Sequence, residues 1–587
     1  MAPEKALPVS DAWENVDGYV DSLLDLIGNN NLLRTLCGGV HVLDFFTSDP
    51  DLYSRILPLE WRNFFARRDI MDILDLLLRE DIGLIVAAKE DCWRNGPAPP
   101  PSLLDYVTLV REHLLNRDVK SSRCSRNRAM KPTQKMARHI AVGMNIKKVH
   151  EVGLFARYVS DLSLDISHTG TGEITHLVDF GSGQNYLGRA LASEPYNKHI
   201  VAIESRSHNA ERAKEFDVMA RLATKQVSMV NKKAFRSGLV RRQAVPNVPT
   251  PPPEPQPNLP TTDVSHLSLD PAIAASPNAK GTIQYVKHRI QDGELSSVVT
   301  NIPSQEYKPP TLMIMSLHSC GNLVHHGLRS LVLNPSVKAV AMVGCCYNLL
   351  TERLGPATYK LPSLRPTTHD HPRLSTTGEA NDPHGFPMSD RLCSYGINSE
   401  GIRLNITARM MAVQAPGNWG AKDSEAFFTR HFFRALLQKI FLDYGIVGPP
   451  SVDGEGGSPL GHSSGTPIVI GSLRKGCYAT FTTYVRGALD KIYENSSVEQ
   501  SSLFQTKMAN LSDEDIAVYE SDYIQRKKDL SVMWSLMAFS AGVVEAAIVV
   551  DRWLWLSEQR EVAECWVESV FEYGLSPRNL VVVGVKK

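Results

Sequence analysis

Apolar residues recur at spacings of three and four along residues 12–115, as in segments 18–26 and 103–115. This spacing places apolar side chains on one face of a helix, so it predicts amphipathic helices. Aspartate and glutamate are frequent in the same stretch, and the solvent-facing sides of these helices are therefore expected to be acidic. A helical N-terminal region over residues 1–120 is predicted.

A second pattern starts at residue 174, where short apolar runs alternate with segments of helical spacing. The runs are residues 174–180, 199–204, 282–290, 311–317 and 337–343. The last two are apolar almost without interruption, which is typical of strands covered on both faces. Strands that alternate with helices indicate a parallel α/β sheet.

Polar segments interrupt this pattern and suggest how the chain is organised. Residues 246–260 contain eight prolines, and residues 355–383 and 448–465 are rich in glycine, proline, serine and threonine. Such compositions do not build a core. The expected organisation is a helical region (1–120), an α/β core (121–350) interrupted by a proline-rich insertion (244–280), a loop insertion (351–390), a mainly helical region (391–570) and a final strand that returns to the core (571–587).

Composition narrows the class of protein. The 587 residues are too many for one hydrophobic core, so several structural units are expected. Lysine plus arginine and aspartate plus glutamate both total 63, which excludes a polycation, and nine cysteines do not indicate a disulfide-stabilised secreted protein. The N-terminus shows no secretory signal, and Glu545 interrupts the most apolar window, 533–550. An intracellular protein, cytoplasmic or nuclear and without a membrane span, is expected.

Although the net charge of the chain is zero, two segments have a local excess of positive charge. Residues 117–148 contain ten lysines and arginines against one acid, and residues 218–243 contain no acid. A phosphate-contacting surface would bind RNA by neutralising its backbone, with an affinity that falls as salt rises. A solvated helix face is the alternative for either stretch.

The most informative motif is a glycine loop after the first predicted strand. Asp179 precedes Gly181 and Gly183, and the next predicted strand ends in Glu204. Glycines allow a tight turn against a ligand, and a carboxylate at the next strand end suits ribose hydroxyls. The dinucleotide spacing G-x-G-x-x-G is not met, because the next glycine is Gly188. The D-x-G-x-G pattern instead resembles the first motif of S-adenosylmethionine-dependent methyltransferases; a turn that needs glycine only for packing is the alternative.

This resemblance implies a cofactor site at the carboxyl edge of the sheet. Its expected residues are Asp179, Gly181, Ser182, Gly183, Gln184, Glu204, Asp292 and His318. Asp292 follows the third predicted strand, where it either accepts a hydrogen bond from the adenine amino group or serves as a turn residue.

Histidine and cysteine side chains follow the fourth and fifth predicted strands. His318 and Cys320 come after the fourth, and Cys345 and Cys346 after the fifth. Neighbouring parallel strands end at the same edge, so these four residues are the candidate catalytic group, either as thiolate nucleophiles or with His318 as a general base. Zinc is a third alternative, but adjacent cysteines rarely reach one ion, and no metal site is predicted. Cysteines that only fill space remain a further alternative.

Several segments resemble the methyltransferase-like protein 25 family, whose relatives include the so-called ribosomal RNA adenine dimethylase domain-containing protein. They are residues 178–192 (VDFGSGQNYLGRALA), 316–323 (SLHSCGNL) and 343–352 (VGCCYNLLTE). The resemblance implies a class I methyltransferase fold, which is a Rossmann-like α/β sheet with a helical N-terminal extension and a helical C-terminal insertion. It also suggests that Lys147, Lys148, His150 and Glu151 border the entrance for cofactor or substrate.

The functional hypothesis is an S-adenosylmethionine-dependent methyltransferase that acts on an intracellular macromolecule, with RNA favoured over protein. The Asn/Asp-Pro-Pro-aromatic motif that base-amino methylases commonly carry after the fourth strand does not occur in the chain, so that route of RNA modification is not predicted. The alternative is a non-catalytic scaffold that binds the cofactor and uses its helical flanks to bind a protein partner.

Overall fold

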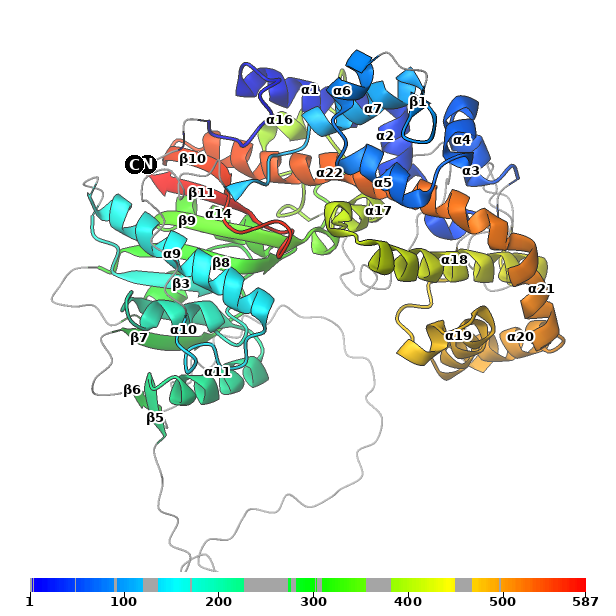
Figure 1. Ribbon diagram of the computed structural model, residues 1–587. Helices are drawn as coiled ribbons and strands as arrows, with labels where there is room; N and C mark the ends of the chain where they lie inside the picture. Colours follow the sequence, from blue (N-terminus) through cyan, green and yellow to red (C-terminus); the bar gives the residue numbers. More distant parts are fainter. Residues whose placement is uncertain are drawn as a thin grey trace, which may run out of the picture.

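A mostly parallel sheet lies at one end of the computed structural model, which describes residues 3, 5–47, 49–88, 92–119, 136–168, 172–225, 273–275, 281–300, 302, 309–354, 382–448, 467–495 and 498–587 (Figure 1). Within these residues the sheet has seven strands in the order β10-β11-β9-β8-β3-β4-β7. They are β3 (His176–Phe180), β4 (His199–Glu204), β7 (Thr282–Lys287), β8 (Leu312–Cys320), β9 (Val337–Cys346), β10 (Val562–Ser569) and β11 (Leu580–Lys586).

The strand order reverses beside β3. From β3 the chain passes outward to β4 and β7, and then returns to the other side of β3 to form β8 and β9; these strands are parallel. The ends of β3 and β8 therefore flank the point where such sheets bind ligands. The Rossmann-like α/β fold predicted from the sequence is confirmed.

The C-terminal strands show where the sequence prediction was incomplete. The late strand predicted at residues 571–587 is β11, which pairs antiparallel with β9. The prediction of a mainly helical region over 391–570 missed β10, which pairs antiparallel with β11 at the edge of the sheet. Glu564 and Glu568 interrupt the apolar pattern of β10, so the segment does not have the alternation of a half-buried strand.

Helices cover both faces of the sheet. On one face, α9 (Ile146–His168) and α10 (Tyr186–Ala192) share a hydrophobic cluster with side chains of the strands (Figure 1). On the other face, α14 (Leu323–Leu333) packs on β8 and β9, and α22 (Lys527–Ser557) packs on β10 and β11. This double cover explains why the central strands are apolar on both sides.

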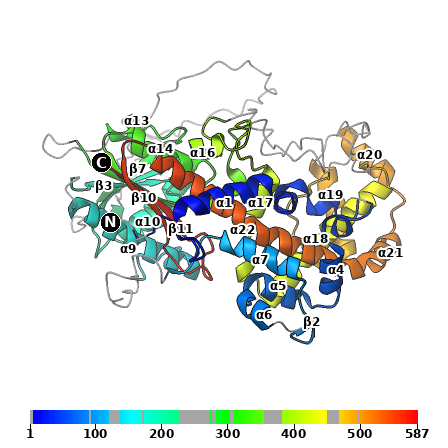
Figure 2. The same cartoon turned by 90° about the horizontal axis from the view of Figure 1, so that it is seen from above.

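Helix α22 is long and central, and it contacts the N-terminal helices, α18 and the edge of the sheet. The N-terminal helices α1 (Val16–Asn29) and α7 (Pro101–Glu112) lie along it, while α18 (Ala421–Asp443), α19 (Phe481–Asn495), α20 (Val498–Met508) and α21 (Asp513–Tyr523) gather at the end farthest from the sheet (Figure 2). One described helical stretch, Asp513–Ser557, is long and apolar enough to cross a membrane, but 94% of its most apolar window is buried inside the protein.

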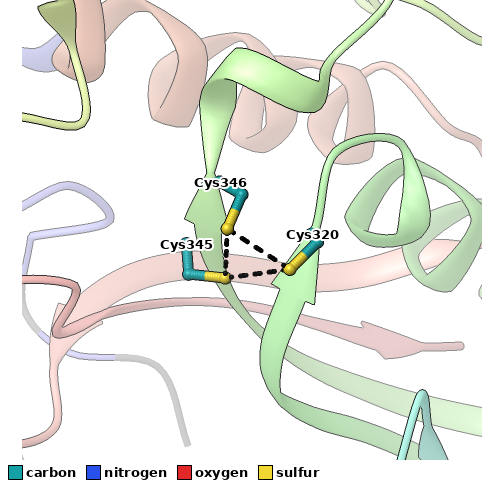
Figure 3. A group of neighbouring side chains, drawn as sticks. All are labelled: Cys320, Cys345 and Cys346. Carbon is teal, nitrogen blue, oxygen red and sulfur yellow. Dashed lines mark hydrogen bonds between the residues drawn. The ribbon is translucent and has the colours of Figure 1, made fainter. Parts of the chain in front are cut away.

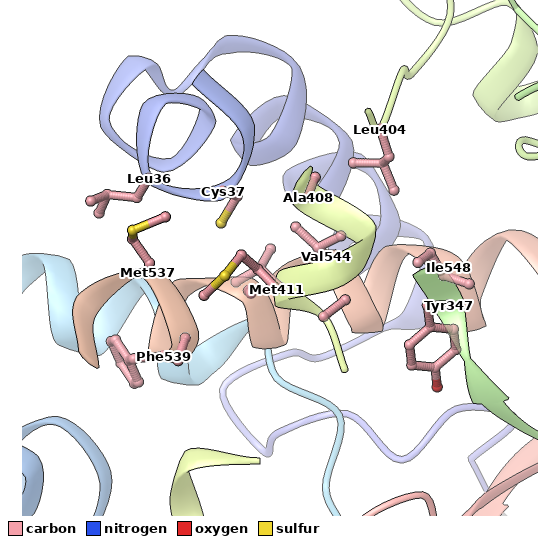
Figure 4. Close-up of a cluster of buried hydrophobic side chains, with 14 of the residues drawn as sticks. Leu36, Cys37, Tyr347, Leu404, Ala408, Met411, Met537, Phe539, Val544 and Ile548 are labelled. Atoms are coloured by element: carbon pink, nitrogen blue, oxygen red, sulfur yellow. The ribbon is translucent and has the colours of Figure 1, made fainter. Parts of the chain in front are cut away.

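The N-terminal helical region does not have a core of its own. Figure 4 shows Cys37 from the N-terminal region beside Met411 of α17 (Ile406–Met411) and Val544 of α22. These side chains belong to one hydrophobic cluster that continues to the α14 face of the sheet. The hydrophobic core therefore continues across the predicted boundaries at residues 120 and 390.

Candidate functional site at the carboxyl edge of the sheet

The glycine loop between β3 and α10 has a left-handed backbone at three positions. Gly181 and Gly183 have φ values of 67° and 57°, and Asn185, just before α10, has a φ of 51°. Glycine is required at Gly181 for a second reason, because an added Cβ would lie 2.8 Å from the Leu323 side chain. At Gly183, in contrast, an added Cβ would meet nothing within 4 Å. The loop therefore leaves open space over Gly183.

Glu204 holds this loop in place. It ends β4, beside β3, and its Oε2 accepts a hydrogen bond from the Gly183 amide at 2.9 Å while Oε1 accepts one from the Arg206 amide at 2.8 Å. Its neighbour Asp179 is buried, and burial together with the negative charge of Glu204 raises the pKa of Asp179 to about 8. Asp179 is therefore mostly protonated at neutral pH.

The loop residues fit the adenosyl cofactor predicted from the sequence. Glu204 is only 8% exposed, and its carboxylate has lone pairs left for ribose hydroxyls. The buried Ser182 Oγ, in the residue before Gly183, has no hydrogen-bond partner in the structure. Gln184 is held by Tyr186, whose hydroxyl donates to Gln184 Oε1 at 2.5 Å.

Asp292 is used as a turn residue. Its Oδ1 accepts a hydrogen bond from the Glu294 amide at 3.0 Å, and its carbonyl accepts one from Arg329 of α14. These hydrogen bonds do not reach the glycine loop or Glu204. The predicted contact of Asp292 with adenine remains a prediction, and the alternative interpretation as a turn residue describes its observed contacts.

His318 is paired with a carboxylate that the sequence did not connect to it. Strand β8 continues past the predicted apolar run, and His318 Nε2 lies 3.0 Å from Glu151 Oε2 of α9. Glu151 is fully buried; its Oε1 accepts from Ser576 Oγ at 2.7 Å, and Lys148 Nζ lies 3.0 Å from Oε2. Burial raises the pKa of Glu151, but the hydrogen bond and charge of His318, the Ser576 hydrogen bond and the Lys148 charge outweigh it and bring the pKa to about 2.

Sequence reasoning placed Glu151 near the site but not in this role. It predicted only that Glu151 borders an entrance, and it did not predict Ser576 at all. His318 is 167 residues from Glu151 in sequence, and Ser576 is 425 residues from it. The only signal for this role in the sequence was that Glu151 is an acidic residue close to the basic residues Lys147 and Lys148. A carboxylate bound to an imidazole fixes its orientation and stabilises its protonated form.

The three predicted cysteines converge at the ends of β8 and β9 (Figure 3). Cys320 Sγ lies 3.4 Å from Cys345 Sγ and 3.3 Å from Cys346 Sγ, and the last two are 3.4 Å apart. The sulfur atoms of the adjacent residues Cys345 and Cys346 lie close together because Ser319 pairs with Gly344 and Cys320 with Cys346. Cys345 is therefore the extra residue of a β-bulge, which turns its side chain toward the same place as that of Cys346.

Positive groups surround this cluster. Hydrogen bonds from Cys320 and Cys345 lower the pKa of Cys346, and the charges of His318 and Arg578 lower it further. The buried guanidinium of Arg552 lies against Gly344, where an added Cβ would be 2.5 Å from its Nη1. The pKa of Cys345 is raised by its hydrogen bonds to Cys320 and Cys346 and by burial, so a negative charge at the end of β9 is favoured on Cys346 and not on Cys345.

The basic stretches predicted to contact phosphate are only partly described. Arg117 is 18% exposed and forms an ion pair with Glu545 of α22, and Lys148 is engaged with Glu151. Both side chains are partly exposed, and each pairs with a buried carboxylate. Residues 120–135 and 226–243, which carry most of the remaining positive charge, lie outside the described residues.

The fold and the site define a class of protein. Residues 147–353 match a family described as a methyltransferase domain, and the match begins on α9 and ends just after the cysteine cluster. The chain therefore carries a methyltransferase domain.

Comparison with curated proteins identifies particular relatives. The chain is 28% identical over 278 residues to probable methyltransferase-like protein 25 of Mus musculus, and 26% identical over 298 residues to that of Homo sapiens. These matches cover 47% and 50% of this chain but only 37% and 39% of the relatives. The predicted resemblance to methyltransferase-like protein 25 is confirmed. No solved structure matches the chain.

Proposed function

We propose that the protein is an S-adenosylmethionine-dependent methyltransferase. The observation that carries the proposal is the glycine loop: Glu204 accepts a hydrogen bond from the Gly183 amide, open space lies over Gly183, and the buried Ser182 Oγ has no partner. When bound, S-adenosylmethionine supplies an electrophilic methyl group on a positively charged sulfur. Glu204 would hold the ribose hydroxyls, and the glycine loop would enclose the methionine part. Asp179, at the start of the loop, would be a neutral acid.

His318 would accept a proton from the methyl acceptor. Its ring is 37% exposed at the strand end next to the loop, while its Nε2 is hydrogen-bonded to the buried Glu151. A carboxylate in that position keeps the ring oriented and stabilises the charge that it gains when it takes up a proton. Glu151 is therefore a positioning residue, and His318 is the candidate general base.

Titration calorimetry with S-adenosylmethionine tests the cofactor assignment. The intact chain should bind, and Gly183→Leu should abolish binding because its side chain would fill the open space. Gly445→Leu is the matched control: Gly445 also has a positive φ, 66°, and its added Cβ would have only an ordinary contact with Lys507. Absence of binding by the intact protein, or equal binding by the two variants, would refute the proposal.

We further propose that the acceptor is an intracellular macromolecule in the cytoplasm or nucleus, with RNA ahead of protein. The excess of lysine and arginine in 117–148 and 218–243 supports RNA, since neutralised phosphates release counterions. Mass spectrometry of nucleosides and peptides from cells with and without the gene identifies the modified molecule. A salt-independent affinity for RNA would exclude these stretches as its docking surface. Cofactor binding without transfer to RNA or protein would instead favour a scaffold that binds protein partners through its helical flanks.

A further inference from the structure

The sulfur atoms of Cys320, Cys345 and Cys346 form a nearly equilateral triangle with sides of 3.3–3.4 Å. The β-bulge at Cys345 is what makes the arrangement possible, because a regular strand would turn Cys345 and Cys346 to opposite faces. A disulfide would need one side of the triangle to shorten to about 2.05 Å and would exclude the third sulfur. Three equidistant sulfurs can instead share one bound atom.

We propose that these three cysteines bind a Zn²⁺ ion at the carboxyl edge of the sheet. Thiolates are soft ligands that select zinc over magnesium or calcium, and three protein ligands are the usual number in an open zinc site. Zinc–sulfur bonds of about 2.3 Å in a tetrahedron require sulfur–sulfur distances of about 3.8 Å, so each side of the triangle needs to open by only about 0.4 Å. Small side-chain rotations supply that change.

The charge around the triangle suits a metal–thiolate group. One Zn²⁺ with three thiolates has a net charge of −1. Arg552 is 2% exposed, its Nε has no hydrogen-bond partner, and it lies against Gly344, the residue before Cys345. A buried guanidinium without a full set of partners is costly, and a neighbouring negative group offsets that cost.

The proposed ion has a free coordination position. Among the described residues, the group of potential ligands contains these three cysteines and no histidine or carboxylate. Cys320 is exposed to solvent, so the fourth position is open to water or to a donor atom of a substrate. Because the triangle is beside His318, a ligand in that position would be next to the candidate general base.

Metal analysis of the full-length protein, purified under reducing conditions and reconstituted with ZnCl₂, tests the proposal. About one zinc per chain is expected in the intact protein and in Cys477→Ser, whose thiol lies elsewhere, in residues 475–478. Cys320→Ser and Cys346→Ser should each lose most of the zinc, and should lose the thiolate-to-metal charge-transfer band when Co²⁺ replaces it. Circular dichroism of the same samples shows whether each variant is folded.

Several outcomes would overturn the proposal. They are no stoichiometric zinc in the intact chain, full zinc in both folded variants, or a disulfide involving Cys320 detected by mass spectrometry in the zinc-reconstituted protein. Calorimetry with S-adenosylmethionine on the same samples separates this proposal from the proposed function. Cofactor binding without zinc refutes the metal site alone, and zinc without cofactor binding refutes the cofactor assignment alone.

Discussion

Replacing Asp179 with asparagine should stabilise the protein, although Asp179 belongs to the glycine-loop motif. The folded pKa of Asp179 is raised to about 8 by burial and by Glu204, against an ordinary value of 3.8. At pH 7 the folded protein therefore holds the acid protonated, while the unfolded chain ionises it freely. The difference of about 3 pH units, at about 1.4 kcal/mol each, corresponds to about 4 kcal/mol of lost stability as an upper bound.

Asparagine has nearly the shape of the protonated acid and does not ionise, so Asp179→Asn removes this loss. Because the folded pKa is raised, the contribution of Asp179 is fully favourable below about pH 3.8 and is lost as the pH rises toward about 8. The wild-type and variant thermal midpoints should therefore coincide near pH 4 and separate progressively up to pH 8.

Tryptophan fluorescence during heating, recorded from pH 4 to pH 9, measures this separation. Asp292→Asn is the matched control, because Asp292 is an exposed turn residue whose substitution should leave the pH profile parallel to that of the wild type. A variant of Asp179 that is less stable at every pH, or a constant offset across the range, would refute the reasoning.

Three further predictions concern buried contacts. Glu151→Gln should lower the thermal midpoint at neutral pH. Because the pKa of Glu151 is lowered to about 2, the wild type loses stability between about pH 4.5 and 2, and the variant should lose less over that range. Methyl transfer should fall about tenfold at unchanged cofactor affinity, because the Glu151 carboxylate positions His318. Asp551→Ala should cost at least about 3 kcal/mol in chemical denaturation, since it leaves three hydrogen bonds from Met388 and Ser389 unpaired. Gly344→Ala should cost about 1–3 kcal/mol by crowding Arg552, whereas Gly476→Ala, with open space around it, should be nearly neutral.

The sheet could be predicted because its central strands are apolar on both faces. Strands β8 and β9 each appear in the sequence as an almost unbroken apolar run, and β4 ends at the predicted Glu204. The glycine loop was predictable for a similar local reason, since left-handed positions such as those of Gly181 and Gly183 favour glycine. For each of these two features, the residues that allow its prediction are neighbours in the sequence.

The pairing of groups around the site could not be predicted in the same way. Nothing local in the sequence connects Glu151 to His318 or Ser576, because the contact depends on how α9 packs on the sheet. The bulge at Cys345 depends on the register between two strands, which apolar runs do not specify. The partner of Arg117 is a further example: it belongs to a basic stretch in the sequence, and nothing local indicates its ion pair with the buried Glu545 of α22.

The methyltransferase domain recognised by comparison does not contain the whole of its own site. The match ends at residue 353, yet β10 and β11, which complete the sheet, come after it, and Ser576 between them fixes Glu151. Glu545 of α22 is bound by Arg117 from the N-terminal side and by Arg578 from the C-terminal side. The two flanks therefore meet at Glu545, and residues 147–353 alone lack Ser576, which binds the carboxylate that orients His318.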